Sequence, residues 1–269
     1  MKAYRINAFT DRSFAGNPAV VCPLAGWLPD ETLQAIAIEN RVSETAFFVR
    51  SGDAFELRWF APAAEVELCG HATLATAFAI STYIDTDRDH FEFRTRWSGI
   101  LGVKRKGNVF TLDFPARAAI PVDEGEAWSE IAGTRVVERW VAVKTLAVCE
   151  SEADVASARP QMDRIAELPG DGLILTAPGS SSDFVARYFA PHRGVPEDPV
   201  TGSAYCSLAP YWSRRLGRKR LTARQLSKRG GELTVEHAGE RVFISGRAIP
   251  YFVGEITMPQ SQSFALTEK

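Results

Sequence analysis

The chain has 269 residues, enough for one large domain or two of ordinary size. Apolar residues make up 45% and charged residues 24%, so the chain can bury a sizeable core and is not of the disordered class. The net charge of -2 gives no general attraction to nucleic acid or to an anionic membrane. No run of about 18 apolar residues could span a bilayer, and the N-terminus lacks the apolar core of a signal peptide. We therefore expect a soluble, cytoplasmic protein with neither nucleic acid nor membrane as partner.

Strand patterns dominate the chain, because most segments alternate apolar and polar residues or are rich in β-branched and aromatic ones. In chain order they cover 41–49, 55–60, 99–114, 140–150, 172–177, 183–189, 231–249 and 251–258, with hairpin turns at 106–108 and 238–240. Helices are fewer, and are expected over 30–40, over 126–133, over 162–168, and after Gly70 and Gly202. The helix after Gly70 is apolar on nearly every side, which is typical of a buried helix.

Two segments of the chain resemble each other. Each begins with a strand that ends in Arg-aromatic-Phe-Ala-Pro, at 58–62 and at 187–191, and each crosses an acidic loop to a Gly-X-Ala helix start, at Gly70 and at Gly202. The Phe-Ala-Pro elements lie 129 residues apart and the Gly-X-Ala elements 132, so the second loop is three residues longer. Short apolar strings can match by chance, but here order, residue type and spacing agree. The chain therefore contains an internal repeat of about half its length.

This repeat predicts an α+β fold of two similar lobes. We expect lobes at 1–115 and 116–269, with the C-terminal end of the chain free to return to the first lobe. Each lobe would be a strongly bent, mostly antiparallel sheet wrapped around one central helix. Both central helices would begin at the same crevice between the lobes.

Two helix starts that face one crevice can bind an anion. A helix N-terminus offers unpaired N–H groups and partial positive charge, and glycine lets a ligand approach the backbone closely. The sequence therefore predicts a site for a carboxylate or an oxyanion beside Gly70 and Gly202. The polar side chains at these two helix starts are Cys69, His71, Asp198, Thr201 and Ser203. Each could serve as an ordinary helix cap if it stood alone.

Glu44 is the candidate for acid–base chemistry. It precedes an apolar strand and lies between the small polar residues Ser43 and Thr45. A carboxyl group that faces a dry pocket has a raised pKa, which suits the removal and return of a proton near neutral pH. An exposed glutamate at a strand start is the equally acceptable alternative at this point.

Metal and nucleotide cofactors have no support in the sequence. The histidines, His71, His90, His192 and His237, form no HxH, HExxH or Cys/His cluster. The chain also has no GxGxxG and no GxxxxGK[ST] motif. Its four cysteines, Cys22, Cys69, Cys149 and Cys206, include no CxxC pair, which is typical of a reducing compartment. We predict no cofactor and no metal.

One stretch, 213–233, carries eight Lys or Arg residues and a single acid. A solvated helix end and loop is the simpler interpretation, since positive charge is favourable at a helix C-terminus. Recruitment of an anionic substrate or partner is the alternative. No aromatic residues alternate with these charges as they do in nucleic-acid-binding motifs.

Several motifs together resemble the phenazine-biosynthesis-like (PhzF-like) isomerase family, which shares the fold of diaminopimelate epimerase. They are "AFTDRSFAGNPAVV" at 8–21, "SETAFF", "LCGHATLA", "EDPVTGSA", "RGGEL" and "FISGRA". They occur in the family's order along essentially the whole chain. The resemblance implies a cofactor-independent enzyme that moves a proton on a small carboxylate-bearing substrate, and it leaves a homodimer open as the assembly.

The resemblance also implies roles for single residues. Glu44 would be the proton shuttle, while His71, Asp198 and Ser203 would line the site and orient or polarise the substrate. Backbone N–H groups near Gly70 and Gly202 would hold the substrate carboxylate.

Cys69 raises the main alternative. The related epimerases use two facing cysteines, each just before its helix start, and Cys69 matches the first. The second position is occupied by Pro199, and Cys206 lies one turn inside its helix, where it is expected to face the core. Cys69 is thus expected to line the substrate site rather than to act as a base.

Three functions therefore remain in view. The first is a proton-shifting isomerase, the second an epimerase or racemase acting next to a carboxylate, and the third a non-catalytic small-molecule-binding protein with the same fold. An intact Glu44 favours an enzyme, because a protein that only binds has no need of a shuttle carboxylate.

Overall fold

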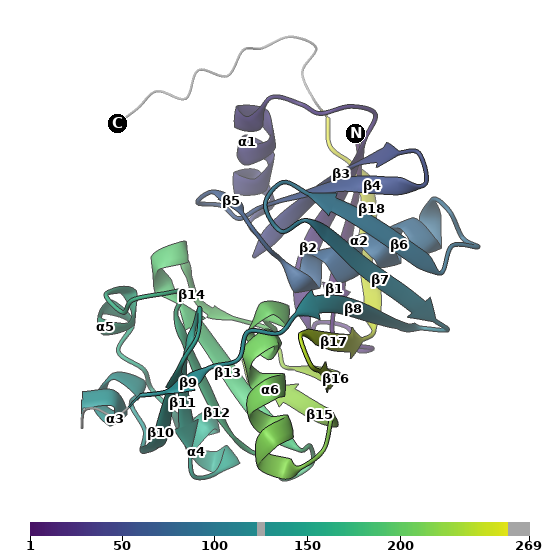
Figure 1. Cartoon of the computed structure of the whole chain (residues 1–269). Helices are drawn as coiled ribbons and strands as arrows, with labels where there is room; N and C mark the ends of the chain where they lie inside the picture. The colour runs from purple at the N-terminus through teal and green to yellow at the C-terminus, as the bar shows by residue number, and fades with distance from the viewer. Residues whose placement is uncertain (123–126, 258–269) are drawn as a thin grey trace.

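The computed structural model describes residues 1–122 and 127–257 and has two lobes (Figure 1). The first half of the chain forms β1 (Lys2–Ala8), β2 (Asn17–Leu24), α1 (Asp30–Asn40), β3 (Glu44–Ser51), β4 (Ala54–Phe60), β5 (Glu65–Val66), α2 (Gly70–Tyr83), β6 (His90–Thr95), β7 (Ile100–Lys106) and β8 (Val109–Pro115). The second half begins with β9 (Ile120–Pro121), α3 (Ala127–Ala132), β10 (Val136–Val141), β11 (Thr145–Cys149), α4 (Glu152–Ser157), α5 (Met162–Ala166) and β12 (Leu173–Pro178). It continues with β13 (Phe184–Ala190), β14 (Val195–Asp198), α6 (Tyr205–Leu216), β15 (Arg220–Gln225), β16 (Gly231–Ala238), β17 (Arg241–Gly246) and β18 (Ala248–Glu255), and short 3-10 turns lie at Pro191–Arg193 and Gly202–Ala204.

The strand pairings of the first lobe recur in the second. In the first lobe β1–β2 is antiparallel, β2–β3 parallel, β3–β4 antiparallel and β4–β6 parallel. In the second, β10–β11, β11–β12, β12–β13 and β13–β15 repeat this order of directions. Antiparallel pairing of β8 with β17 joins the two lobes. The predicted α+β fold of two similar lobes is confirmed.

Each sheet bends around one helix, α2 in the first lobe and α6 in the second (Figure 1). Nearly all of α2 is buried, as its lack of a polar face predicts. Its polar residues are accommodated by bonds within the helix. The hydroxyl of Thr73 donates to the carbonyl of Cys69 at 2.5 Å, and that of Thr76 to the carbonyl of Ala72 at 2.7 Å.

An Arg–Glu pair marks the same place in each repeat. Arg58 donates to Glu65 through Nε at 2.7 Å and through a terminal nitrogen at 2.6 Å. Arg187 makes the corresponding fork with Glu197, at 2.7 and 3.0 Å. The partners are 7 residues apart in the first repeat and 10 in the second, which reproduces the three-residue difference in loop length. These bidentate pairs tie each loop to its strand just before the helix start.

The strand that follows each repeat pairs in the sheet of the other lobe. β18, which follows the second repeat, pairs along its length with β1 of the first lobe. β9, which follows the first repeat, pairs with β10 of the second lobe. The chain therefore crosses between the lobes twice, and each crossing extends the sheet that it enters.

Some predicted elements need correction. The strand expected over 140–150 is a hairpin, because the chain turns at Ala142, whose N–H donates to the carbonyl of Lys144 at 3.0 Å. The patterns did not predict β1, β2, β6, β15 and α4. β15 lies inside the basic stretch 213–233, where the many charged residues conceal the alternation of apolar and polar residues in the strand. Glu126 and Met258, at the ends of two predicted elements, fall outside the described residues.

The basic stretch is thus more than a helix end and a loop. Three of its arginines form ion pairs, Arg215 with Glu138, Arg218 with Asp183 and Arg224 with Glu152, and Arg229 is turned inward. Within residues 1–122 and 127–257, no helix has the length and apolar character needed to cross a bilayer.

Candidate active site

The two helix starts meet in the middle of the molecule. A Cβ atom added to Gly70 would lie 2.9 Å from the Cα atom of Gly202, and one added to Gly202 would lie equally close to Gly70. Only glycine permits this approach of one backbone to the other. The residues before them, Cys69 and Thr201, make no side-chain capping bond, so the first N–H groups of both turns remain available to a ligand.

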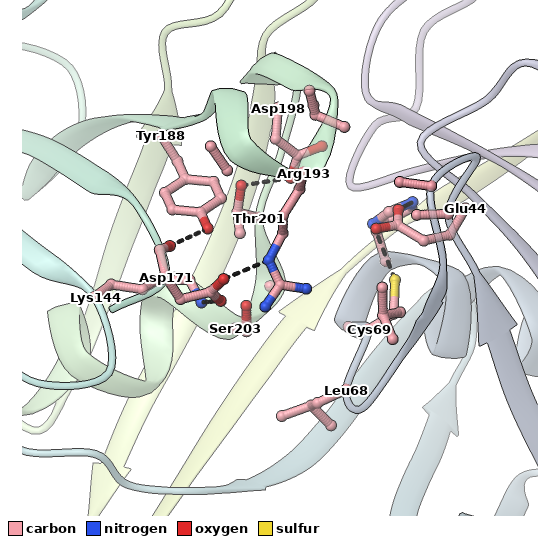
Figure 2. Close-up of a pocket in the computed structure, with 18 of the residues that line it drawn as sticks. Glu44, Leu68, Cys69, Lys144, Asp171, Tyr188, Arg193, Asp198, Thr201 and Ser203 are labelled. Atoms are coloured by element: carbon pink, nitrogen blue, oxygen red, sulfur yellow. Dashed lines mark hydrogen bonds and ion pairs between the residues drawn. The ribbon is translucent and has the colours of Figure 1, made fainter. Parts of the chain in front are cut away.

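A cavity of about 190 Å³ lies beside this contact, a size that suits a small molecule (Figure 2). Both lobes line it. The first contributes Glu44, Glu65, Leu68, Cys69, Gly70 and His71, and the second contributes Lys144, Asp171, Tyr188, Arg193, Asp198 and Ser203. All site residues predicted from the sequence, including Gly202, therefore lie around one cavity.

Asn17, which the sequence patterns did not single out, joins the two lobes at this site. Its Nδ2 donates to Asp198 Oδ1 at 2.8 Å and to the carbonyl of Val200 at 2.9 Å. Its Oδ1 accepts the hydroxyl of Ser43 at 3.1 Å. These partners fix the orientation of the amide, so its NH₂ end also lies 3.1 Å from Nδ1 of His71. Three acceptors share the two hydrogens of Nδ2, and since Nδ2 can only donate, it offers no acceptor to a proton on Nδ1.

Arg229 holds the loop that carries Asn17. Its Nε donates to the carbonyl of Gly16 at 2.7 Å, and a terminal nitrogen donates to the carbonyl of Ala15 at 3.0 Å. Gly16 N–H in turn donates to the carbonyl of Gly230 at 2.9 Å. The "RGG" and "FAGNP" segments of the sequence thus meet across the lobes and place Asn17 in the site.

This arrangement determines which nitrogen of His71 carries the proton. Since Nδ1 faces a donor, the neutral ring holds its proton on Nε2. Burial lowers the pKa of His71 to about 3, so the ring is neutral at physiological pH. Its Nε2 lies 3.2 Å from Glu44 Oε2. Neither atom has an aligned hydrogen-bond partner among the described residues, so both remain free to act on a substrate.

Glu44 opens β3 in parallel register with β2, opposite Ala19, and this register carries its side chain into the cavity. The Oε2 atom is covered although the side chain keeps 18% of its exposure. Burial, and then the charge of Asp198, raise the pKa of Glu44 to about 8. Burial likewise raises the pKa of Asp198 to about 6, against hydrogen bonds from Thr201 and Asn17. Glu44 can therefore hold or release a proton near neutral pH.

The raised pKa predicts a pH-dependent cost in stability. Below its unfolded value of 4.5 Glu44 is protonated in both states, whereas between 4.5 and about 8 only the folded state keeps the proton. The free energy of unfolding should therefore fall as pH rises through this window, by about 1.4 kcal/mol per pH unit and a few kcal/mol in all. Glu44→Gln should remove this loss. Urea unfolding of both proteins at pH 5 and pH 8.5 should show a stability advantage of the variant that grows with pH, and a constant difference would contradict the assigned pKa.

Cys69 and Ser203 occupy the two helix starts. Cys69 Sγ lies 3.5 Å from Nδ1 of His71, and burial raises the pKa of the thiol well above its usual value. Ser203 is half-buried and lines the cavity. Cys206 is fully buried in the core, as predicted. A thiol that keeps its proton is a poor base, which fits a site-lining role for Cys69.

The fold assembles a group of potential metal ligands that the spacing of the histidines did not reveal. Ligand atoms of Glu44, Cys69 and His71 all lie within 4.8 Å of one another. A metal would need the thiolate of Cys69 and, to bind beside Glu44, an unprotonated Nε2 on His71. Burial of the thiol opposes the first condition, and the hydrogen bond from Asn17 opposes the second. The protonation states of the trio thus favour proton transfer over metal binding.

Activity is accordingly expected to survive removal of metal ions. Dialysis against a strong chelator should leave turnover within about twofold, and added Zn²⁺ should not raise it. The metal content of the dialysed protein, measured beside its activity, serves as the control. Loss of activity on chelation with recovery on adding one metal would contradict this prediction.

The sequence patterns did not single out several other residues of the cavity, among them Lys144, Asp171, Tyr188 and Arg193. Lys144 did leave a signal, because it is the single charge within the apolar run "WVAVKTLAVC". Its side chain keeps only 6% of its exposure. Asp171 lies in a loop and Arg193 in a short 3-10 turn, where charged residues show no periodic pattern. Tyr188 is the aromatic residue of the repeated motif at 187–191, but nothing in that motif indicated a place at the cavity.

Comparisons with known proteins agree with this geometry. Residues 6–254 match the family model described as phenazine biosynthesis-like protein. An uncharacterized isomerase of Pseudomonas aeruginosa is 46% identical over 259 residues, which cover 96% of this chain and 99% of that protein. A PhzF-family crystal structure from Enterococcus faecalis superposes with a TM-score of 0.92 at 41% identity, covering 96% and 99% of the two chains.

A more distant likeness concerns the fold alone. The crystal structure of a probable proline racemase from Agrobacterium radiobacter superposes with a TM-score of 0.63 at 13% identity, covering 99% of this chain and 96% of that one. That structure therefore shares the two-lobed architecture, as the family resemblance implies. On the family match and the full-length relatives, the chain belongs to the phenazine biosynthesis-like (PhzF) family, whose named relatives include isomerases.

Proposed function

We propose that this protein is a cofactor-independent isomerase that shifts a proton on a small carboxylate-bearing substrate. The observation that carries the proposal is the facing pair of Glu44 Oε2 and His71 Nε2. Both atoms are buried and without an aligned partner in the described part of the chain, and they lie at the wall of a cavity. Unsatisfied buried polar atoms are costly, so their retention at a cavity favours a catalytic role.

Each group in the site has a separate role in this reaction. The free N–H groups beside Gly70 and Gly202 would bind the substrate carboxylate, as helix starts bind anions. The substrate would contain a carbon–carbon double bond. Glu44 would remove a proton from the carbon next to this double bond and return it at another carbon of the same substrate. The Nε2–H of His71 would stabilise the Glu44 carboxylate while the proton is away, and Asp198 would hold Asn17 and, through it, the tautomer of His71.

Exchange with solvent tests this function across a range of candidate substrates. Small unsaturated carboxylic acids should be incubated with the protein in D₂O and followed by proton NMR. A substrate should shift its double bond and take up deuterium at the new C–H position, to an extent set by exchange of the Glu44 proton with solvent. If no carboxylic acid isomerises or exchanges, while the same acids bind in the cavity, the non-catalytic binding function would replace the proposal.

The epimerase alternative is tested at Cys69, the single cysteine that the structure places at the cavity wall within its described residues. Racemisation by two thiols needs a second cysteine opposite Cys69, and the remaining cysteines, Cys22, Cys149 and Cys206, are buried away from the cavity. Cys69→Ala should therefore keep at least about a tenth of wild-type turnover, a barrier change of no more than about 1.4 kcal/mol. A loss as large as that of Glu44→Gln would revive the epimerase alternative. Cys22→Ala, a buried change outside the cavity, is the control for effects on folding.

A further inference from the structure

A cluster of charged residues occupies the wall of the cavity opposite Glu44, and the proton transfer described above does not use it. Lys144 Nζ donates to Asp171 Oδ2 at 2.6 Å. Arg193 Nε donates to the other oxygen of the same carboxylate, Asp171 Oδ1. His192 Nε2 lies 3.6 Å from Oδ1. One acid thus serves two permanent cations.

Most of the donors in this cluster remain unused. A lysine has three N–H donors and an arginine five, and Asp171 takes one from each. The terminal nitrogens of Arg193 have no partner within residues 1–122 and 127–257. Figure 2 shows the Arg193 side chain extending across the cavity between Asp171 and the helix start at Cys69. The free donors therefore face the space that a substrate would fill.

The other acid on this side does not use these donors. Asp198 Oδ1 accepts from Asn17 at 2.8 Å, and its Oδ2 accepts from Thr201 at 2.5 Å. Glu65, across the cavity, is already paired with Arg58 and Arg96. Lys144 keeps only 6% of its side-chain exposure, and its charge is met by the shared Asp171 carboxylate and by the Tyr188 ring, whose centroid lies 5.2 Å from Nζ. A buried cation that shares its one carboxylate is still incompletely compensated. An additional anion is what the cluster lacks.

The internal repeat places this cluster in a functional position. The parallel strands β2 and β3 carry Asn17 and Glu44 at their N-terminal ends. The corresponding parallel strands β11 and β12 follow directly after Lys144 and just after Asp171. In each sheet, the end at which these parallel strands begin therefore faces the cavity. In the first lobe it carries the groups for proton transfer, and in the second lobe it carries cations.

We propose that Lys144 and Arg193, oriented by Asp171, bind a second anionic group of the substrate. The inference rests on the proposed function for the first carboxylate, which the helix starts at Gly70 and Gly202 would hold. The substrate class is then a small molecule with a carboxylate at one end and a second carboxylate or a phosphate at the other. Charge-assisted hydrogen bonds to the terminal nitrogens of Arg193 and to Lys144 would orient it across the cavity.

Binding measurements on matched acids test this proposal. Calorimetry should compare pentanoate, glutarate and 2-phosphoglycolate, which are a monoanion, a dicarboxylate and a carboxylate with a phosphate. The wild type should bind at least one of the two dianionic acids about tenfold or more tightly than pentanoate. The acid that binds better then distinguishes a second carboxylate from a phosphate.

Arg193→Gln should reduce this preference to within about threefold and leave pentanoate binding nearly unchanged, while Arg193→Lys should restore part of it. Arg193 is 45% exposed, so these variants are better suited to the test than changes at buried Lys144. Arg135→Gln, which breaks an exposed Arg–Glu pair of the same lobe, is the matched control and should keep the full preference.

Equal affinity of the wild type for all three acids would overturn the proposal, and so would an equal loss for all three in Arg193→Gln. The calorimetric measurement reports binding of the acids and does not require turnover. Proton exchange without a preference for dianions would therefore reject only the second anion site. A preference for dianions in a protein that exchanges no proton would reject only the isomerase function.

Discussion

Glu44→Gln is expected to reduce turnover by about 10²–10⁴-fold or more, while the fold and the affinity for substrate stay close to those of the wild type. Glutamine has nearly the shape of glutamic acid, and its amide oxygen can accept from the Nε2–H of His71, 3.2 Å away in the wild type. It can neither take up a proton from carbon nor return one. Deuterium incorporation into substrate, followed by NMR, should be lost to the same extent as turnover.

The binding control separates chemistry from recognition. The helix starts at Gly70 and Gly202 are untouched by this change, so calorimetric affinity for the substrate, or for a carboxylate that occupies its site, should change by less than about threefold. Glu67→Gln is a matched control, because Glu67 belongs to the same lobe but is exposed and does not line the cavity. Turnover of Glu44→Gln within a few fold of the wild type would show that another group moves the proton.

The central architecture could be predicted from the sequence because the same sequence pattern occurs in both halves of the chain. The Arg-aromatic-Phe-Ala-Pro segments, the glycines at 70 and 202, and the apolar residues that follow them are local patterns with a fixed spacing. The buried helix α2 follows from its lack of a polar face, and the meeting of the two glycines follows from their equivalent places in the two lobes. Local chemistry and internal symmetry thus agree on where the site lies.

The remaining features depend on contacts between distant segments. Asn17 is the first residue of β2, after a segment whose composition gives no sign of a site. Its role depends on residues 26 to 183 positions away along the chain. The group of Glu44, Cys69 and His71 likewise arises only where β3 meets α2. The return of the C-terminal end to the first lobe was left open by the sequence, but the pairing partners of β18 and β9 depend on which sheet edge is open, which hydrophobic alternation does not encode.

The charged wall of the cavity escaped prediction for a related reason. Asp171 and Arg193 lie in loops, where charged residues are ordinary, and Lys144 sits in a tight turn that the pattern merged into one long strand. Nothing in the chain between them indicates a shared carboxylate. Only the parallel pairing of β11 with β12 brings Lys144 to Asp171, 27 positions away.

Gly202→Ala should be nearly as damaging as Glu44→Gln, and for a steric reason. The new methyl carbon would lie 2.9 Å from Gly70 Cα and 3.4 Å from the carbonyl carbon of Gly70, both backbone atoms that cannot rotate away. The two helix starts must therefore separate, at a cost of about 1–3 kcal/mol in stability. Their N–H groups would no longer converge on one carboxylate. Because a displacement of about 1 Å can lower a rate about 10²-fold, turnover should fall at least that far.

Affinity distinguishes this loss from that of the shuttle residue. Gly202→Ala should weaken carboxylate binding and lower the midpoint of thermal unfolding, whereas Glu44→Gln should do neither. Gly102→Ala, a change on β7 where the nearest atom to the new methyl group is 3.9 Å away, is the control and should leave activity and stability unchanged. Wild-type carboxylate affinity in Gly202→Ala would mean that the substrate is held elsewhere in the cavity, away from the helix starts. The cations of the second lobe would then be the first place to look for its carboxylate, because Lys144 and Arg193 hold the remaining unused donors of that wall.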